Sequence, residues 1–341
     1  MERHPWEPVC ERPGGLVVPA RIGTTAGPTR GEARGPGWER CAPGWWVPRA
    51  RADCIEQHIL EQAARLPDSG AVTGWAALRW RGGAFFDGTT GRTGRLPVPL
   101  VLGGGANLRW HARSTISRER FPPSERTVVD GIPVATVQRA VFDEMRRVGT
   151  LLHAVQTIEM TAAARLISVA LMTAYVTPGR NGFTGVPLAR RALALATDDS
   201  RSPRETWLRL IWLSLGLPAP LCNQPVFDLG GRLLGYPDLF DPVAGLVGEY
   251  DGADHKGRER HRRDVARQQL FRDHGLEYFE VVAGDTAEVA GARMLRARRR
   301  ARFHPPEARA WTLEPPPRWP VEETLDQRLV RWGLVHQLTH H

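Results

Sequence analysis

Short hydrophobic runs separated by turn-forming residues dominate the chain between positions 226 and 250. The apolar runs are residues 226–229, 233–240 and 246–250, and the breaks between them are Gly230-Gly231 and Asp241-Pro242. Glycine pairs and Asp-Pro steps are typical of tight turns, and apolar runs of this length between turns indicate strands. The pattern therefore predicts a three-stranded antiparallel meander.

Helical patterns flank this predicted meander on both sides. Ser202-Pro203-Arg204-Glu205 has the form of a capping box, and apolar residues recur at helical spacing from there to Gly216. A strongly charged helix is predicted at about 258–274, and a further strand at 276–282. The order helix, three strands, helix, strand predicts an α/β core within a chain that is α+β overall.

Carboxylates gather on the second and third predicted strands. Side chains alternate between faces along a strand, so Glu249 and Asp251 share one face while Tyr250 takes the other. A hairpin partner that carries Asp238 brings this residue opposite Glu249. Because neighbouring carboxylates repel one another, such a cluster is costly unless a cation or a basic group neutralises it. Mg²⁺ takes oxygen ligands and keeps several waters, which makes it a natural occupant.

The same residues carry a resemblance to a known family. An aspartate on the second strand, an acidic pair on the third and a glutamate at the start of the first helix resemble the restriction-endonuclease-like PD-(D/E)XK fold. More narrowly, Glu-Tyr-Asp-Gly-x-x-His at 249–255, followed by Asp264 and Arg267, resembles bacterial proteins related to the very-short-patch-repair (Vsr) endonucleases. The resemblance covers about residues 200–283 and implies an αβββαβ nuclease core.

The resemblance also implies roles for individual residues. Asp238 and Glu249 would be ligands of Mg²⁺ or Mn²⁺, and Glu205 would reach the same site through water. His255 corresponds to the histidine that the repair enzymes use near the scissile phosphate, as a general acid or base. Asp251 stands where the fold has its usual lysine, which removes an expected cation. The predicted catalytic set is therefore Glu205, Asp238, Glu249, Asp251 and His255.

Charge favours a polyanionic partner. The chain has 341 residues, a formal net charge of +9 and a pI near 10.3. Arginines concentrate on the second predicted helix and after the last predicted strand, as expected of a surface that binds a phosphate backbone. The residues predicted to bind DNA are Arg258, Arg262, Arg263 and Arg267. The structural alternative is a solvated helix face on which Asp264 and Arg267 pair with each other.

The first half of the chain has a different pattern. Helices are predicted at about 52–65, 71–80 and, with breaks, 136–176, and strands at 97–102, 108–112 and 132–134. The segments 72–78 and 131–143 resemble the front part of the AbiEi-like antitoxins of type IV toxin-antitoxin systems. Many actinobacterial proteins join such a part to the endonuclease-like domain. The DNA-binding winged helix of these antitoxins is poorly matched by residues 1–48.

These patterns divide the chain into four predicted parts. They are a loose lead-in with a winged-helix remnant at 1–60, an AbiEi-like α+β domain at 61–198, the nuclease-like domain at 199–303, and a proline-rich linker with a C-terminal helix at 304–341. Four cysteines without C-x-x-C spacing support neither a zinc site nor a disulfide framework. Without a long apolar run or a signal peptide, we expect a cytoplasmic protein that has no membrane segment.

Two functions from different classes fit the sequence. The first is a metal-dependent DNA endonuclease or nickase in repair or defence, and the joint presence of Asp238, Glu249 and His255 favours it. The second is a non-catalytic DNA-binding antitoxin or repressor with a cognate toxin and a degenerate nuclease domain, which the missing lysine favours. An RNA-directed nuclease is a third option, because electrostatic attraction does not distinguish RNA from DNA.

Overall fold

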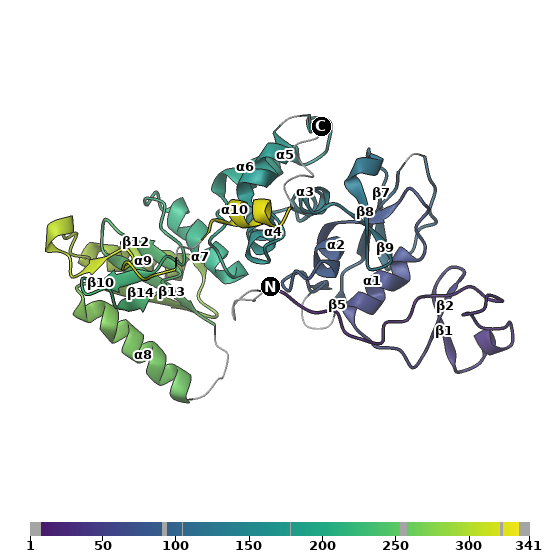
Figure 1. Ribbon diagram of the computed structural model, residues 1–341, viewed down its shortest axis with the longest axis horizontal. Coiled ribbons are helices and arrows are strands. Elements are labelled where there is room, and N and C mark those ends of the chain that lie inside the picture. Colours follow the sequence, from purple (N-terminus) through teal and green to yellow (C-terminus); the bar gives the residue numbers. More distant parts are fainter. Residues whose placement is uncertain are drawn as a thin grey trace. The chain divides into compact units, whose positions relative to one another are not determined.

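The computed structural model describes residues 8–90, 94–103, 105–177, 179–252, 258–320 and 323–333, with backbone alone for 258–264. The protein is a mixed α+β structure, as the sequence predicts, and it divides into two compact units (Figure 1). Unit 1 comprises residues 1–196 and 325–341, and unit 2 comprises residues 197–324. Within the described ranges, no helix combines the length and the apolar character needed to cross a bilayer.

Unit 1 is built around a mixed sheet with the strand order β7-β6-β3-β9-β8. Its strands are β1 (Trp38–Ala42), β2 (Trp45–Pro48), β3 (Ala71–Val72), β4 (Thr89–Thr90), β5 (Gly94–Arg95), β6 (Val98–Val101), β7 (Ser114–Ser117), β8 (Arg126–Val129) and β9 (Ile132–Ala135). Its helices are α1 (Ile55–Ala63), α2 (Gly74–Trp80), α3 (Val137–Arg147), α4 (Leu151–Ala163), α5 (Val169–Val176), α6 (Val186–Leu195) and α10 (Leu325–Arg331). Strands β1 and β2 form a separate antiparallel hairpin.

Two expectations for unit 1 are wrong in detail. The strand predicted at 108–112 is absent from this described segment, and β7 begins at Ser114 instead. The physical reason is that Trp110 is 74% exposed, so the run has no apolar face to bury. The helix predicted from residue 71 begins at Gly74, because Ala71–Val72 pairs as β3 inside the sheet.

Unit 2 consists of short sheets with helices packed around them. Its strands are β10 (Val226–Asp228), β11 (Leu233–Gly235), β12 (Leu239–Asp241), β13 (Leu246–Asp251), β14 (Glu277–Val282) and β15 (Trp311–Thr312). Its helices are α7 (Pro203–Ser214), α8 (Arg258–Asp273) and α9 (Ala287–Arg300). In the sheet β12-β13-β14, β12 is antiparallel to β13 and β14 is parallel to it.

The predicted meander is wrong in its second strand. Residues 233–240 form two strands, β11 and β12, which belong to different sheets and are separated by Tyr236-Pro237-Asp238. Pro237 has no N–H to give to a strand ladder. Its carbonyl accepts a hydrogen bond from the Asn223 N–H at 2.8 Å instead. The chain therefore leaves one sheet and enters the next at the residue that precedes Asp238.

The segment predicted as a proline-rich linker is also different from expectation. It contributes β15, which pairs with the free edge of β10 to give the sheet β11-β10-β15. The Trp311 ring lies edge-on to Phe240, with ring centroids 5.0 Å apart, and Trp319 lies edge-on to Phe227 at 4.7 Å. Aromatic burial of this kind ties the segment to unit 2, so it is part of the fold.

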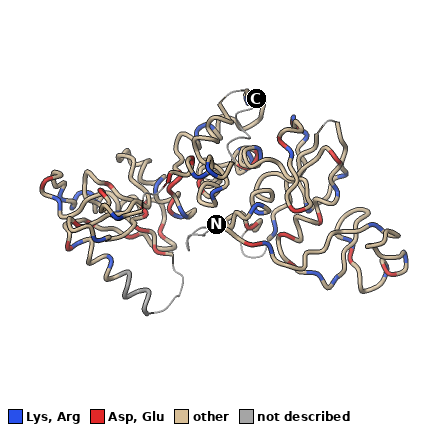
Figure 2. The backbone as a smooth tube through the Cα atoms, viewed as in Figure 1, with Lys and Arg blue, Asp and Glu red and all other residues tan. Residues whose placement is uncertain are grey.

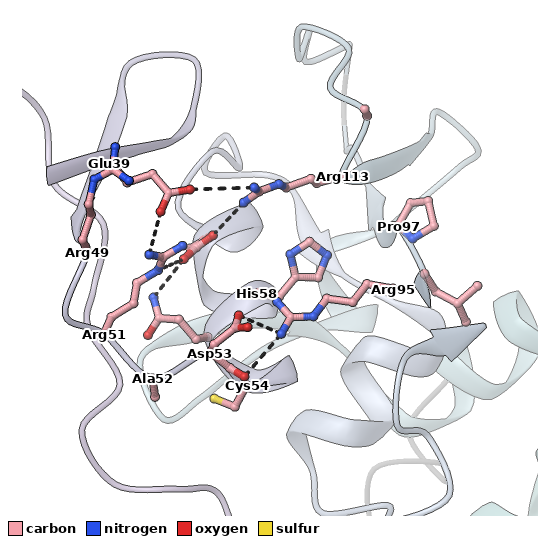
Figure 3. Close-up of a pocket in the computed structure, with 14 residues that line it drawn as sticks. Glu39, Arg49, Arg51, Ala52, Asp53, Cys54, His58, Arg95, Pro97 and Arg113 are labelled. Atoms are coloured by element: carbon pink, nitrogen blue, oxygen red, sulfur yellow. Dashed lines mark hydrogen bonds and ion pairs between the residues drawn. The ribbon is translucent and has the colours of Figure 1, made fainter. Parts of the chain in front are cut away.

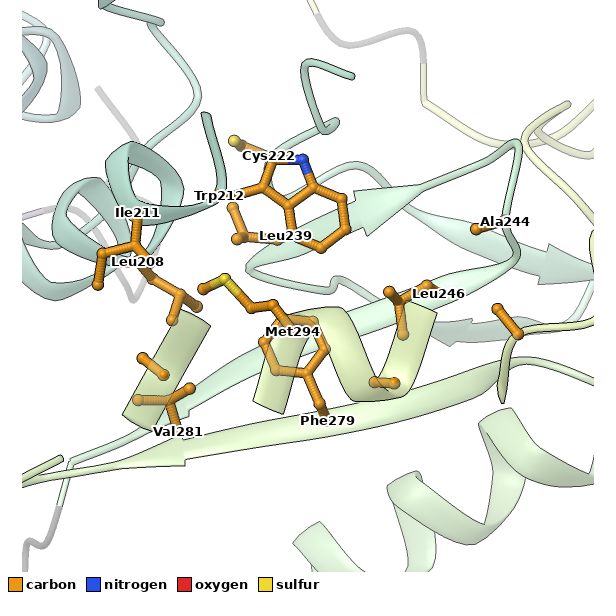
Figure 4. Close-up of a cluster of buried hydrophobic side chains, with 13 residues drawn as sticks. Leu208, Ile211, Trp212, Cys222, Leu239, Ala244, Leu246, Phe279, Val281 and Met294 are labelled. Atoms are coloured by element: carbon orange, nitrogen blue, oxygen red, sulfur yellow. The ribbon is translucent and has the colours of Figure 1, made fainter. Parts of the chain in front are cut away.

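Helices cover both faces of the β12-β13-β14 sheet. Helices α7 and α9 cover one face, where Trp212 stacks on Phe279 with ring centroids 6.2 Å apart (Figure 4). Helix α8 covers the other face through Phe271, which packs with Phe240 and Tyr278. Alternation along β13 turns Tyr250 toward the first face and Glu249 toward the second. The predicted opposition of these two side chains is confirmed.

A substitution at Gly248, in the centre of β13, tests this packing. A Cβ atom at this position would lie 2.2 Å from the ring of Phe279, which is itself held by the stacked Trp212. We expect Gly248→Ala to destabilise unit 2 by about 1–3 kcal/mol, because the overpacked core must shift. Hydrogen-exchange mass spectrometry of peptides from β12 to β14 measures the change locally.

The matched control is Gly252→Ala, where the nearest atom outside the chain neighbours lies 3.9 Å away, on Tyr250. This variant should change protection by the equivalent of less than about 1 kcal/mol. Equal protection of the β12 to β14 peptides in both variants would contradict the tight packing of Gly248 against Phe279.

Candidate functional site

The site is built where β12, β13 and the first turn of α7 meet. Acidic and basic positions are interspersed throughout unit 2 and do not separate into one acidic and one basic half (Figure 2). Against this mixed background, Asp238 lies close enough to Glu205, Glu249 and Arg267 of α8 for the charges of all three to act on it. The structure therefore brings together three of the carboxylates that the sequence predicts.

Asp238 occupies the break between β11 and β12. The ladder between β12 and β13 ends with Leu239 opposite Gly248, so the N–H of Tyr250 lies beyond the last strand pair. The Asp238 Oδ2 atom accepts a hydrogen bond from this N–H at 2.8 Å and replaces the missing strand partner. Asp238 is half-buried. Burial is the largest cause that raises the pKa of its carboxyl group to about 8, and the charges of Glu205 and Glu249 add to it.

Glu249 is the most tightly held carboxylate of the cluster. It is buried on the α8 face of β13, where Arg267 Nη2 donates to its Oε2 atom at 2.6 Å. The hydroxyl of Tyr278, from β14, donates to the same oxygen at 2.9 Å. Burial and the neighbouring Glu249 charge raise the pKa of Tyr278, so it remains a neutral donor.

Glu205 closes the cluster from the α7 side. The predicted capping box is confirmed in its first half, because Ser202 Oγ accepts from the Glu205 N–H at 3.2 Å. The Glu205 Oε2 atom in turn accepts from the Arg201 N–H at 2.8 Å and from the Asn223 side-chain amide at 2.7 Å. Burial is the main cause of the raised pKa of Glu205.

The remaining predicted site residues have different outcomes. Asp251 is exposed at the end of β13. His255 lies outside the described residues, as do the side chains of the predicted DNA-binding residues Arg258, Arg262 and Arg263. Arg267, predicted to bind DNA, forms the ion pair with Glu249, and 41% of its side-chain surface remains exposed.

Sequence reasoning missed two partners of the site. Tyr278 reaches Glu249 because β14 lies parallel to β13 with Glu249 opposite Glu280, a register that depends on how α8 returns the chain. Asn223 bridges Glu205 and the carbonyl of Asp199 from a loop, with its backbone at φ +51°. Asparagine tolerates this left-handed conformation better than most residues, which is the one signal the sequence offered.

The donor atoms agree chemically with a hard divalent cation. Asp238 and Glu249 offer carboxylate oxygens, and Mg²⁺ is bound in many proteins by one or two carboxylates together with waters and substrate phosphates. Among the described residues, no group of three or more histidine, cysteine, aspartate or glutamate side chains is arranged to hold a metal ion.

The raised pKa of Asp238 predicts a pH dependence of stability. The folded value of about 8 lies above the ordinary value of 3.8, so the folded state holds the proton more tightly than the unfolded state. The resulting contribution to stability is present below pH 4 and is lost as pH rises through 8, with a slope of at most about 1.4 kcal/mol per pH unit. We therefore expect unit 2 to be more stable at pH 5 than at pH 8.

Asp238→Asn should flatten this profile, because the amide keeps an acceptor for Tyr250 and cannot ionise. The pH dependence of stability is measured by guanidinium unfolding from pH 5 to pH 8 in EDTA, combined with hydrogen exchange of β12 and β13 peptides. Glu307→Gln, at an exposed carboxylate in unit 2, is the control and should keep the wild-type slope. Parallel profiles for wild type and Asp238→Asn would show that Asp238 ionises normally.

Comparison with known proteins identifies similar proteins but indicates no activity for the chain. No family model matches the chain, and no solved structure matches it. The chain is similar to two uncharacterized proteins of Mycobacterium tuberculosis, MT2308 of strain CDC 1551 / Oshkosh and Rv2248 of strain ATCC 25618 / H37Rv. Each is 29% identical over 128 residues, which is 36% of this chain and 47% of the relative. The chain thus spans about half the length of the curated relatives that it matches.

Proposed function

We propose that unit 2 is a metal-dependent phosphodiesterase domain that acts on DNA as an endonuclease or nickase. The observation that carries the proposal is the convergence of three carboxylates on one largely buried cluster: Glu205 from α7, Asp238 from the break between β11 and β12, and Glu249 from β13. Burying carboxylates beside one another costs free energy, so packing alone does not favour this arrangement. A site that holds a cation and a phosphate explains it.

The order of elements supports a restriction-endonuclease-like core. Helix α7 precedes the strands, β12 and β13 form the hairpin that carries Asp238 and Glu249, and α8 leads into a parallel strand, β14. This order is the one that the sequence resemblance implies, with the difference that the second strand is broken at Pro237. The break is compatible with the proposed site, because it leaves the Asp238 carboxylate beside the β13 backbone.

Asp238, Glu249 and the groups that hold Glu249 have proposed parts in the reaction. Asp238 and Glu249 would hold Mg²⁺ or Mn²⁺, which when bound polarises the phosphate and lowers the pKa of a water. Tyr278 and Arg267 orient Glu249 by donating to its Oε2 atom. The partly exposed Arg267 side chain is also able to contact a phosphate oxygen from its solvent side. His255 remains the predicted general acid or base.

The second candidate is a DNA-binding module without catalytic activity, of the antitoxin-repressor kind with a toxin partner. One observation favours it: the Arg267 guanidinium already neutralises Glu249 at 2.6 Å. The position of the expected lysine is taken by Asp251, which is exposed and adds a negative charge near the site. An arginine that permanently replaced the cation would leave a phosphate-binding surface with no means of activating water.

Metal binding separates the two candidates first. We expect 10 mM Mg²⁺ or Mn²⁺, compared with EDTA, to raise the thermal unfolding midpoint of the wild-type protein, because binding to the folded state stabilises it by mass action. The isosteric double variant Asp238→Asn/Glu249→Gln should lose this increase, and Glu307→Gln should keep it. An equal increase in all three proteins would place the metal elsewhere.

Cleavage is the second test. We expect the wild type to nick supercoiled plasmid in Mg²⁺ or Mn²⁺, and the double variant to nick it at least about 100-fold more slowly, because metal assistance is worth several kcal/mol. A labelled RNA of the same sequence, run in parallel, determines which nucleic acid is cut. DNA binding without cleavage in both proteins would establish the binding-module candidate.

A further inference from the structure

A second polar site lies in unit 1, apart from the carboxylate cluster. A pocket of about 450 Å³ opens between the β1-β2 hairpin, the start of α1 and the residues around β5 and β7 (Figure 3). Its charged lining residues are Arg49, Arg51, Arg95, Arg113, Glu39, Asp53 and Glu61. Positive charges exceed negative ones by one in this lining, so the pocket favours an anion.

Two of the arginines are fixed by a ring of alternating charges. Arg51 donates from Nε to Glu61 at 2.6 Å and from Nη1 to Glu39 at 3.0 Å. Arg113 approaches the same two carboxylates, at 3.4 Å from Glu61 and 4.0 Å from Glu39. Because Glu61 is almost fully buried, the ring holds both guanidinium groups in place before any ligand arrives. Preorganisation of this kind lowers the cost of binding.

The remaining arginines have donors to spare for a ligand. Arg95 uses Nη2 to bind the exposed Asp53 at 2.8 Å, and Figure 3 shows its guanidinium beside the His58 ring. Arg49 is exposed, and no described residue forms an ion pair with its guanidinium. Guanidinium groups of this kind bind phosphate oxygens through paired N–H donors.

His58 and the start of α1 also line the pocket. His58 is buried, and burial, followed by the charges of Arg113 and Arg95, lowers its pKa to about 4, so its imidazole is uncharged at neutral pH. Cys54 is the N-cap residue of α1, and its side chain does not cap the helix. Cys54, Gln57 and His58 line the pocket, so the first turn of α1, at the positive end of the helix dipole, borders it.

An aromatic ring stands on the loop that leads into the pocket. Trp110 is 74% exposed and precedes the lining residue Ala112 by two positions, which is at most about 7 Å along the chain. An exposed tryptophan beside a cationic pocket is a stacking surface for a nucleobase. The pocket and the ring together match a ligand that has an anionic group and a flat aromatic group.

We propose that this pocket binds the phosphate of a nucleotide, with the base stacked on Trp110. Two sources carry this chemistry: a free mononucleotide and the 5′-phosphorylated end of a nucleic-acid strand. The proposal rests on residues of unit 1 alone and does not depend on the activity proposed for unit 2.

Isothermal titration calorimetry of the full chain in EDTA, at 150 mM salt, tests the phosphate site. The probes are AMP, inorganic phosphate and an eight-nucleotide DNA strand with either a 5′-phosphate or a 5′-hydroxyl. Arg49→Gln/Arg95→Gln should weaken binding of the phosphorylated probes at least about tenfold, whereas Arg191→Gln, at an exposed arginine on α6, should leave it unchanged. Binding of AMP alone, or of the phosphorylated strand alone, would support the pocket and identify the source.

A second comparison tests the stacking surface. Trp110→Ala should weaken AMP at least about fivefold and leave the affinity for inorganic phosphate unchanged, because only AMP has a base. Three outcomes would overturn the proposal. The first is equal binding of the 5′-phosphate and 5′-hydroxyl strands together with no binding of AMP. The others are equal affinities in wild type and Arg49→Gln/Arg95→Gln, and no binding of any probe.

Discussion

The hydrogen bond from the Tyr250 N–H to the Asp238 carboxylate determines the arrangement of unit 2 around its candidate site. Strand β13 extends three residues beyond its last pair with β12, and the second of these, Tyr250, has no partner on β12 for its N–H. Pro237 cannot continue the ladder, so the chain changes sheet and the next side chain takes the acceptor role. Satisfying one backbone donor thereby places a carboxylate beside Glu249 and Glu205.

The cluster that results is unevenly neutralised. Glu249 is held by a charged guanidinium and a phenol, whereas Asp238 accepts from a backbone N–H and Glu205 from a backbone N–H and an amide. The less compensated carboxyl groups are therefore Asp238 and Glu205, and burial raises the pKa of both, so each holds a proton more tightly than an exposed carboxyl does. A metal cation that displaced such a proton would neutralise Asp238 and Glu205, whereas Arg267 already neutralises Glu249. In the proposed function, the balance between a metal ion and Arg267 would decide between catalysis and binding.

The sequence predicts local features of this site better than its tertiary partners. The capping box at Ser202, the charged helix α8 and the opposite faces of Glu249 and Tyr250 follow from short-range patterns, because they depend on residues a few positions apart. The strand break at Pro237 was missed because apolar residues on both sides of it read as one run. Tyr278 and Asn223 were missed because the register of β14 and the path of a loop depend on packing across the whole unit.

The arginine content is a poor guide to where a polyanion binds, because many of these residues are used inside the protein. Arg139 is fully buried in unit 1 and binds Glu125 and Asp143 at 2.7 and 2.9 Å. On α9, Arg298 binds Asp241 and Arg300 binds Glu277. These arginines are neutralised and contribute little long-range field.

Surface charge that attracts a partner must come from exposed arginines without such pairs. Arg49 beside the unit 1 pocket and Arg296 and Arg299 on α9 are of this kind, since no described residue forms an ion pair with them. The position of such arginines, more than the net charge of +9, therefore indicates where a polyanion is attracted. The two proposed sites differ accordingly: the unit 1 pocket has guanidinium donors that would bind an anion, whereas the unit 2 cluster has carboxylate oxygens that would require a cation before a phosphate could approach.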